Sequence, residues 1–125
     1  MKPMIMSTVI VSASAIMEAS IRSIFGSLSA VQIIGSAAGC LSALQLVREL
    51  EPELLVIDSN LPGQDTKVLL QKIKQEGLGT RSIVLTGTRE QERRAFAAGA
   101  DSVFPRHGSN DQLNAMVARL GRADS

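Results

Sequence analysis

The amino-acid sequence predicts an α/β fold, a doubly wound five-stranded parallel sheet with helices on both faces. Two patterns lead to this prediction. Short apolar runs of strand length alternate along the chain with segments of helical periodicity. In addition, Asp58 directly follows the most apolar of these runs, where a buried strand would end in a turn. In open parallel α/β sheets, this end of the strands is where ligands bind.

The first part of the chain predicts two strands and two helices. Thr8–Val11 is a short β-branched run, typical of a buried strand. Apolar residues then recur at helical spacing from about Ala15 to Leu28, which predicts a helix with one apolar face. Val31–Gly35 predicts an edge strand, because a glutamine interrupts its apolar run. The apolar stripe of a second helix lies between Leu41 and Leu50.

The middle of the chain continues the alternation. Leu54–Ile57 is uniformly apolar, which predicts the central strand of the sheet, covered on both faces. A third helix contains Leu69–Ile73 and ends near Gly77. Ser82–Leu85 predicts a fourth strand, and a short fourth helix runs from about Glu90 to Ala98.

The last part of the chain predicts one more strand and one more helix. Ser102–Pro105 is expected at an edge of the sheet, because proline cannot donate to a strand ladder. Ser109 and Gln112 make a capping box at the start of the last helix, which has one apolar face as far as Leu120. Right-handed crossovers between these strands place helices on both faces of the sheet.

Composition restricts the classes of function. The 125 residues fit a single domain, and 45% hydrophobic with 20% charged residues is ordinary for a soluble protein. The net charge of +1 gives no reason to expect nucleic acid or a membrane surface as a partner. The single cysteine, Cys40, excludes an internal disulfide. Met1–Met6 does not start a signal peptide, so we expect a cytoplasmic protein.

Three motifs together resemble those of the response-regulator receiver domains of two-component systems, the family that includes the chemotaxis regulators. They are Val56–Gly63 (VIDSNLPG), Ile83–Gly87 (IVLTG) and Ala98–Asp101 (AGAD). The resemblance runs over nearly the whole chain. It implies a flavodoxin-like three-layer sandwich with the strand order 2-1-3-4-5.

The resemblance also implies roles for individual residues. In the family, the aspartate that matches Asp58 accepts a phosphoryl group from a histidine kinase. The residue that matches Asn60 lends its backbone carbonyl to a magnesium ion, and the hydroxyl that matches Thr86, next to Gly87, binds the phosphoryl group. Asp58 and Asn60 are therefore the candidate metal ligands. The lysine that follows the fifth strand in the family aligns with Arg106 in this chain.

The sequence departs from the family at the metal site. Where receivers have two acidic residues after the first strand, this chain has Ser12 and Ala13. Mg²⁺ depends on carboxylates, so we expect weak magnesium binding, no other cofactor and little or no phosphorylation. One hypothesis is that Arg106 occupies the vacated cation site and pairs with Asp58. The alternative places Arg106 in solvent at the rim of the site.

A second departure lies on the face through which receivers signal. The aromatic residue that the family has three positions before its lysine is replaced by Val103, and Phe104 is shifted by one position. A valine cannot act as a rotor that follows Thr86. Compared with the family, the segment between Thr86 and Gly99 is also about two residues shorter.

Other polar residues have simpler interpretations. We expect the Ser12 hydroxyl to be satisfied within a turn and His107 to be exposed in a loop. Cys40 is expected to pack as a small apolar residue. Three arginines interleave with glutamates on the fourth helix, which indicates a solvated helical face rather than an anion site. These arginines are Arg89, Arg93 and Arg94.

Three functions follow from these observations. The leading interpretation is a non-enzymatic, degenerate receiver that acts by protein contact through its fourth helix, fifth strand and fifth helix. Its partner would be a histidine kinase, an output domain outside this chain or another regulator, and a homodimer is a further expectation. The first alternative is a working phosphoacceptor at Asp58. The second is a flavodoxin-like phosphate or flavin binder that uses the loop Ser12–Ser14, although no Trp or Tyr is present to stack on a flavin.

Overall fold

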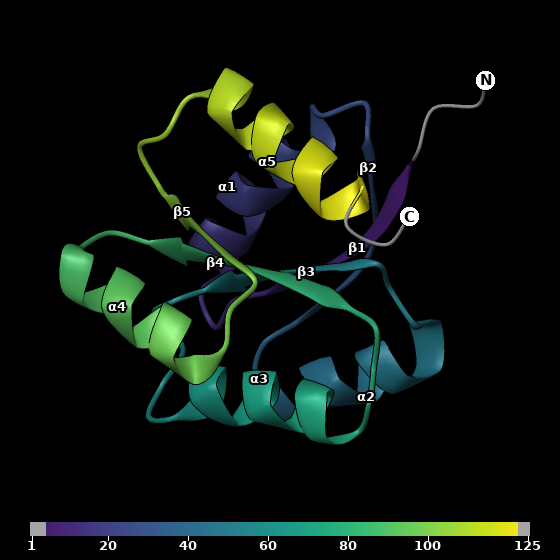
Figure 1. Cartoon of the computed structure of the whole chain (residues 1–125), viewed down its shortest axis with the longest axis vertical. Helices are drawn as coiled ribbons and strands as arrows, with labels where there is room; N and C mark the ends of the chain where they lie inside the picture. Colours follow the sequence, from purple (N-terminus) through teal and green to yellow (C-terminus); the bar gives the residue numbers. More distant parts are fainter. Residues whose placement is uncertain (1–4, 123–125) are drawn as a thin grey trace.

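The five-stranded parallel sheet is present in the structure, a computed structural model in which residues 5–122 are described (Figure 1). The strands are β1 (Met6–Val11), β2 (Val31–Ala37), β3 (Leu54–Asp58), β4 (Arg81–Thr86) and β5 (Ser102–Pro105). The helices are α1 (Ala15–Gly26), α2 (Cys40–Leu50), α3 (Asp65–Gln75), α4 (Arg89–Ala98) and α5 (Asn110–Arg122). The strand order is β2-β1-β3-β4-β5, which confirms the order 2-1-3-4-5. Residues 1–4, within the start that predicts no signal peptide, lie outside the described residues.

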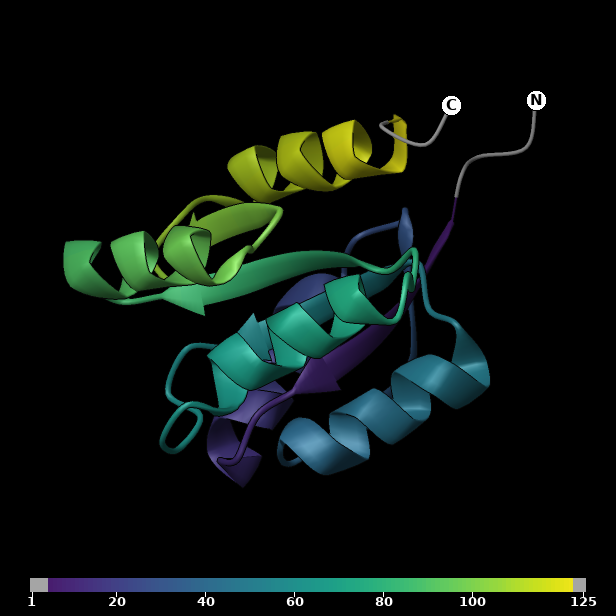
Figure 2. The ribbon, with the colours of Figure 1, turned by 60° about the horizontal axis from the view of Figure 1, so that its bottom comes forward.

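Helices cover both faces of the sheet, so the molecule has three layers (Figures 1 and 2). Side chains alternate between the faces along each strand. In β1, Ile10 belongs to the apolar cluster under α1 and α5, whereas Val9 and Val11 belong to the cluster under α2, α3 and α4. Every residue of β3 is buried, as expected for the central strand. The expectation that β2 and β5 are edge strands is also confirmed.

The predicted elements are present, and their ends differ from prediction by a few residues. β1 begins at Met6 rather than Thr8, because Met6 and Ser7 also pair with β2. α1 ends at Gly26 rather than Leu28, whose side chain is buried beyond the helix end. The residues at which these elements begin and end depend on strand pairing and packing, and the short-range periodicity of the sequence does not show either.

Side-chain caps fix the starts of three helices. Ser14 and Thr88 accept hydrogen bonds from the backbone N–H groups three residues later, at 3.2 and 3.1 Å. The predicted capping box of α5 is formed: Ser109 N–H donates to Gln112 Oε1 at 3.0 Å, and Gln112 N–H donates to Ser109 Oγ at 3.2 Å. Each cap satisfies a backbone donor that the first helical turn leaves free.

Cys40 lies at the first position of α2 and is buried, as predicted for a packed apolar residue. Burial raises the pKa of its thiol, and the nearby carboxylate of Asp65 acts in the same direction.

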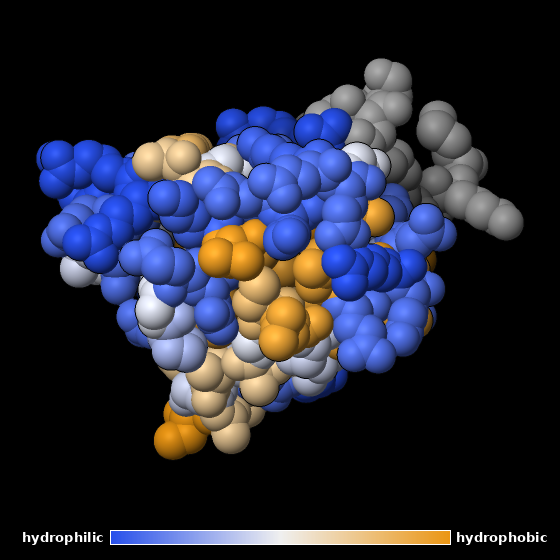
Figure 3. Space-filling view, turned by 90° about the horizontal axis from the view of Figure 1, so that it is seen from below, coloured by the Kyte–Doolittle hydropathy of each residue, from blue (hydrophilic) through white to orange (hydrophobic). Residues whose placement is uncertain are grey.

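The face formed by α2, α3 and α4 is mostly hydrophilic, with apolar residues that extend from the centre of the view to its lower edge (Figure 3). Large apolar side chains that are exposed on these helices are Leu41, Leu50, Val68 and Phe96. Within residues 5–122, no helix is both long and apolar enough to cross a membrane.

Candidate functional site

The predicted site residues gather at the carboxyl end of the sheet. Asp58 is the last residue of β3 and Thr86 the last residue of β4. Arg106 directly follows β5, and Ser12 directly follows β1. Because all these strands are parallel, their ends meet at one edge, where four loops can supply side chains. Asp58 and Thr86 are each only 2% exposed, so their environment is set by neighbouring protein groups.

Three donors surround the carboxylate of Asp58. Its Oδ1 atom accepts a hydrogen bond from the backbone N–H of Asn60 at 3.1 Å and also contacts Nη2 of Arg106 in a salt bridge. The hydroxyl of Ser12 lies 3.1 Å from Oδ2. A buried carboxylate is stable only with such compensation, and here the protein's own groups provide it.

The ion pair between Arg106 and Asp58 supports the hypothesis that Arg106 occupies the cation position, rather than lying in solvent. The pair is asymmetric in exposure: 28% of the Arg106 side chain is exposed, but only 3% of the Asp58 side chain. It is formed through Nη2 alone, and the buried Nε of Arg106 has no hydrogen-bond partner. The bidentate geometry that a guanidinium allows is therefore not used.

Ser12 has a larger role than a simple turn hydroxyl. Its oxygen accepts from the N–H of Ser14 at 3.2 Å, which is the expected turn contact. Its single proton points either to Asp58 Oδ2 or to the carbonyl of Ser14, at 3.1 and 3.2 Å. The sequence pattern gives no sign of the contact with Asp58. A hydroxyl engaged in this way is not free to cradle a phosphate, which weighs against the flavin-binding alternative.

The residues at this site do not fit a magnesium ion. Ser12 and Ala13 replace carboxylates, and Asp58 already accepts from a guanidinium and a backbone amide. Among residues 5–122, no three His, Cys, Asp or Glu side chains lie together in a group that could hold a metal. A hard cation would have to displace Arg106 while gaining a single carboxylate.

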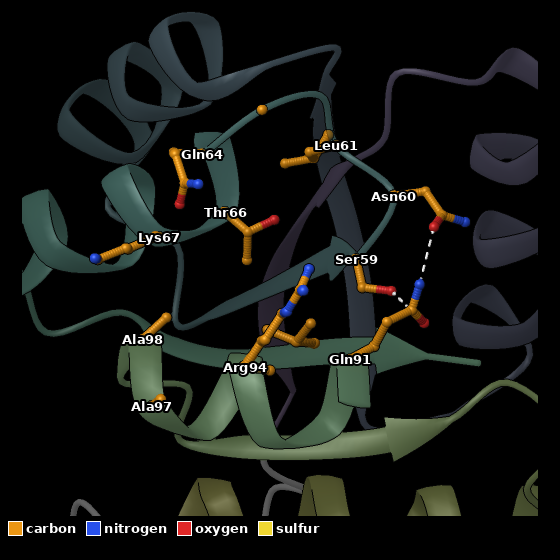
Figure 4. A pocket seen from close by; sticks show the side chains of 13 residues that line it. Ser59, Asn60, Leu61, Gln64, Thr66, Lys67, Gln91, Arg94, Ala97 and Ala98 are labelled. Atoms are coloured by element: carbon orange, nitrogen blue, oxygen red, sulfur yellow. Dashed lines mark hydrogen bonds between the residues drawn. The ribbon is translucent and has the colours of Figure 1, made fainter. Parts of the chain in front are cut away.

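Gln91, in the first turn of α4, is a residue of the site that was not among the residues predicted from the sequence (Figure 4). Its Oε1 atom accepts from the backbone N–H of Gly87 at 2.7 Å and from the hydroxyl of Ser59 at 3.2 Å. Its Nε2 atom donates to Oδ1 of Asn60 at 3.1 Å. One signal was available, because Gln91 follows Thr88 by three residues, the spacing of a capping box.

The amide of Asn60 lies between Gln91 and Arg106. In one orientation its oxygen accepts from Gln91. In the opposite orientation the oxygen accepts from Nη1 and Nη2 of Arg106 at 3.0 and 2.8 Å. Hydrogen-bond partners decide between the two orientations: only the first bonds Asn60 to Gln91, and only the second bonds its oxygen to Arg106.

A cavity of about 680 Å³ opens beside this network, between the loop that follows β3, the start of α3 and the inner side of α4. Figure 4 shows Ser59, Asn60 and Gln91 at one end of this cavity, and Ala97 and Ala98 at the other. The two ends of α4 therefore lie at opposite ends of the cavity.

The two residues before Pro105 face opposite sides of the sheet. Phe104 is buried under α1 and α5, whereas Val103 packs at the margin of the cluster under α2, α3 and α4. The Phe104 ring is also held by Gly108, because a Cβ atom at that glycine would lie only 2.4 Å from the ring. Neither residue provides an aromatic side chain that can turn beside Thr86.

The remaining predictions about single residues are confirmed where the structure describes them. His107 is exposed in the turn after β5. Arg89, Arg93 and Arg94 are exposed on α4, and Arg94 pairs with Glu90 one turn away at 2.7 Å. These arginines form a solvated helical face.

The family described as response regulator receiver domain has a model that matches residues 8–118. The Fimbriae Z protein of Salmonella typhimurium is 32% identical over 119 residues, which cover 93% of this chain and 56% of that protein. A protein-glutamate methylesterase/protein-glutamine glutaminase of Methanospirillum hungatei is 35% identical over 75 residues, covering 57% of this chain and 22% of that protein. The chain thus spans only part of the length of these curated relatives.

Solved structures show the same fold at lower identity. A two-component response regulator of the LuxR family from Aurantimonas superposes with a TM-score of 0.84 at 21% identity, covering 95% of this chain and 86% of that chain. The response regulator domain of Thermotoga maritima CheB gives a TM-score of 0.80 at 22% identity, covering 97% of this chain and 99% of that chain.

Proposed function

Because the chain belongs to the response-regulator receiver family of two-component signalling, we propose that it is a degenerate receiver that signals by protein contact. In this proposal Arg106 neutralises Asp58 in place of a magnesium ion. The single observation that carries the proposal is the salt bridge between Arg106 and the buried carboxylate. A carboxylate that is already paired and hydrogen-bonded is a poor metal ligand and a weak nucleophile.

Under this proposal the chain does not catalyse its own phosphorylation. Phosphoryl transfer depends on positioning and on neutralising charge at the transferred group, and receivers rely on a metal for that charge. Arg106 supplies one positive charge, but it is directed at Asp58 rather than at an incoming phosphoryl group. Thr86 and Gly87 keep the positions from which a phosphoryl group would be contacted, so a phosphorylated Asp58 remains the alternative to test.

We further propose that the contact surface consists of α4, β5 and α5. Phe96 supports this assignment, because it is a large apolar side chain on α4 that is 53% exposed. Aromatic residues are enriched at protein interfaces. The partner would be a histidine kinase, an output domain, another regulator or a second copy of this chain. Family membership supports a cytoplasmic location and the treatment of residues 1–125 as one receiver-like domain.

A magnesium titration followed by addition of a small acyl-phosphate donor tests the proposal. We expect no saturable change in the NMR signals of Asp58 and Asn60 at submillimolar Mg²⁺, because the carboxylate is already paired. We also expect no mass increase on Asp58 when the donor is added. Intact-protein mass spectrometry measures the second outcome.

The matched control restores the residues that the family has at the site. The triple variant Ser12→Asp, Ala13→Asp, Arg106→Lys should bind Mg²⁺ saturably and acquire a phosphoryl group, since it contains three carboxylates. Rapid phosphorylation of the natural chain at submillimolar Mg²⁺ would instead establish the working phosphoacceptor and overturn the degenerate interpretation.

A further inference from the structure

α4 has the fewest buried side chains of the helices described. Its one buried residue is Ala95, whereas α3 alone buries Leu69, Leu70 and Ile73. The cavity of about 680 Å³ lies along its inner side, where α4 contributes three alanines together with Gln91 and Arg94. An element with few buried apolar contacts opens at low free energy, so α4 depends on the hydrogen bonds at its two ends.

The C-terminal end of α4 is fixed to the sheet. Gly99 ends the helix in the left-handed conformation (φ 103°), and the N–H of Ala100 donates to the carbonyl of Ala95 at 3.0 Å. Asp101 then accepts from the backbone N–H of Ser82 at 2.8 Å, and Ser82 Oγ accepts from the N–H of Asp101 at 3.0 Å. These bonds join the residues after α4 to the start of β4.

The N-terminal end of α4 is held to the site mainly by one side chain. Gln91 bonds to Gly87 and Ser59 at 2.7 and 3.2 Å, and to Asn60 at 3.1 Å when the Asn60 oxygen is turned toward α4. Ser59 and Asn60 follow Asp58 directly, and the Ser59 hydroxyl also accepts from Nη2 of Arg106 at 3.4 Å. Two of the three residues that bond to Gln91 thus belong to the loop that carries the Asp58 carboxylate.

We propose that Gln91 is a latch that couples the state of the Asp58–Arg106 pair to the position of α4. While the ion pair is intact, the latch holds the first turn of α4 against the loop that follows β3. When the pair is broken, Ser59 and Asn60 shift, the bonds to Gln91 are lost, and α4 swings about Gly99 into the adjoining cavity. The movement changes the exposed surface that carries Phe96. This inference rests on the proposed function only in naming α4 as part of the contact surface.

The latch also provides a connection between the site and α4 that does not need an aromatic rotor in β5. Val103 and Phe104 face opposite sides of the sheet, so neither provides an aromatic side chain beside Thr86. Gln91 reaches the site from α4 itself, so a change at Asp58 can act on α4 without passing through β5.

An NMR double-variant cycle tests the coupling in the full chain. Asp58→Asn should shift the amide signals of α4, including Phe96, in the natural background and should lose this effect in the Gln91→Ala background. Gln91→Ala alone should also raise the hydrogen-exchange rate of α4 amides by about tenfold, since it removes hydrogen bonds that hold the first turn. Gln112→Ala is the matched control, because it removes a capping glutamine from α5 without touching the site.

The conservative variant Gln91→Glu separates coupling from simple helix capping. It keeps an acceptor for Gly87 and Ser59 but loses the donor that bonds Asn60 when the Asn60 oxygen faces α4. We therefore expect near-normal exchange protection of α4 together with a weakened response to Asp58→Asn. If Asp58→Asn shifts the amide signals of α4 equally in the natural and Gln91→Ala chains, Gln91 does not couple the ion pair to α4. The proposed function is unaffected by that result. If the natural chain is readily phosphorylated, the proposed function fails while the cycle still reports the coupling.

Discussion

Asp58 and Arg106 form an asymmetric pair. The carboxylate is enclosed by protein, whereas the guanidinium reaches solvent along part of its length. Removing the arginine therefore leaves a buried charge without its counterion, whereas removing the charge of Asp58 leaves an arginine that water can solvate. Loss of one partner of a fully buried pair costs about 3–5 kcal/mol, and partial exposure of Arg106 lowers that figure.

This asymmetry predicts an order of stabilities. Arg106→Ala should lower the free energy of unfolding by about 1–3 kcal/mol at neutral pH, because Asp58 loses the cationic partner that the structure shows. Asp58→Asn should cost less, and the double variant should be about as stable as Asp58→Asn alone. Urea unfolding measures all three, with Arg119→Ala, an exposed residue of α5, as the control. Equal losses for Arg106→Ala and Arg119→Ala would contradict the importance of the pair.

At the level of single residues, the sequence predicts which side chains lie at the ends of strands. It predicts little about which side chains from other loops and helices contact them. Asp58 and Arg106 follow apolar runs, so their meeting at one edge of the sheet could be predicted. The contact of Ser12 with Asp58, and the reach of Gln91 to Ser59, depend on how two loops and a helix pack. No local pattern records that geometry.

At the scale of elements, the position of the aromatic residue in β5 decides whether its side chain lies on the same face as Thr86 and could turn there. A shift of one position in a strand moves a side chain to the other face. Phe104 therefore faces α1 and α5, where Gly108 leaves just enough room for its ring. The strand and its side could be predicted from alternation, but the contact with Gly108 could not, because it is formed by the turn that follows.

Gly108→Ala tests how tightly the ring is held. The added Cβ would lie 2.4 Å from Phe104, so either the ring or the turn must move. We expect a loss of about 1–3 kcal/mol in the free energy of unfolding, as for other overpacked sites. Gly79→Ala is a matched control, because a Cβ added at Gly79 would have no other group within 4 Å. Similar stabilities of the two variants in urea would show that Phe104 can repack.

At the scale of the whole molecule, the three layers follow from the alternation of strands and helices, and the strand order follows from the family resemblance. Contacts between helices of one layer were not predictable, because they join exposed residues far apart in the chain. One example is the pair between Arg48 on α2 and Glu76 at the end of α3, with Nη2 and Oε2 at 2.6 Å.

This pair predicts a dependence of stability on pH. The hydrogen bond from Arg48 lowers the pKa of the Glu76 carboxyl below its ordinary value of 4.5. A carboxyl whose pKa is lower in the folded state stabilises the fold above the unfolded value, and the contribution is lost as the pH falls through the folded pKa. The melting temperatures of the natural chain and Glu76→Gln should differ at pH 7 and converge in acid. A difference that persists well below the folded pKa would contradict this assignment.

The buried thiol of Cys40 can be used to measure how often the layer formed by α2, α3 and α4 opens. An alkylating reagent attacks the thiolate, and both the enclosure of the sulfur atom and its raised pKa slow that reaction in the native chain. The sequence contains one cysteine, so labelling reports on the accessibility of this single site at the start of α2. Labelling rates with and without a bound partner would then show whether binding on the α4 side tightens the whole layer, without any engineered probe.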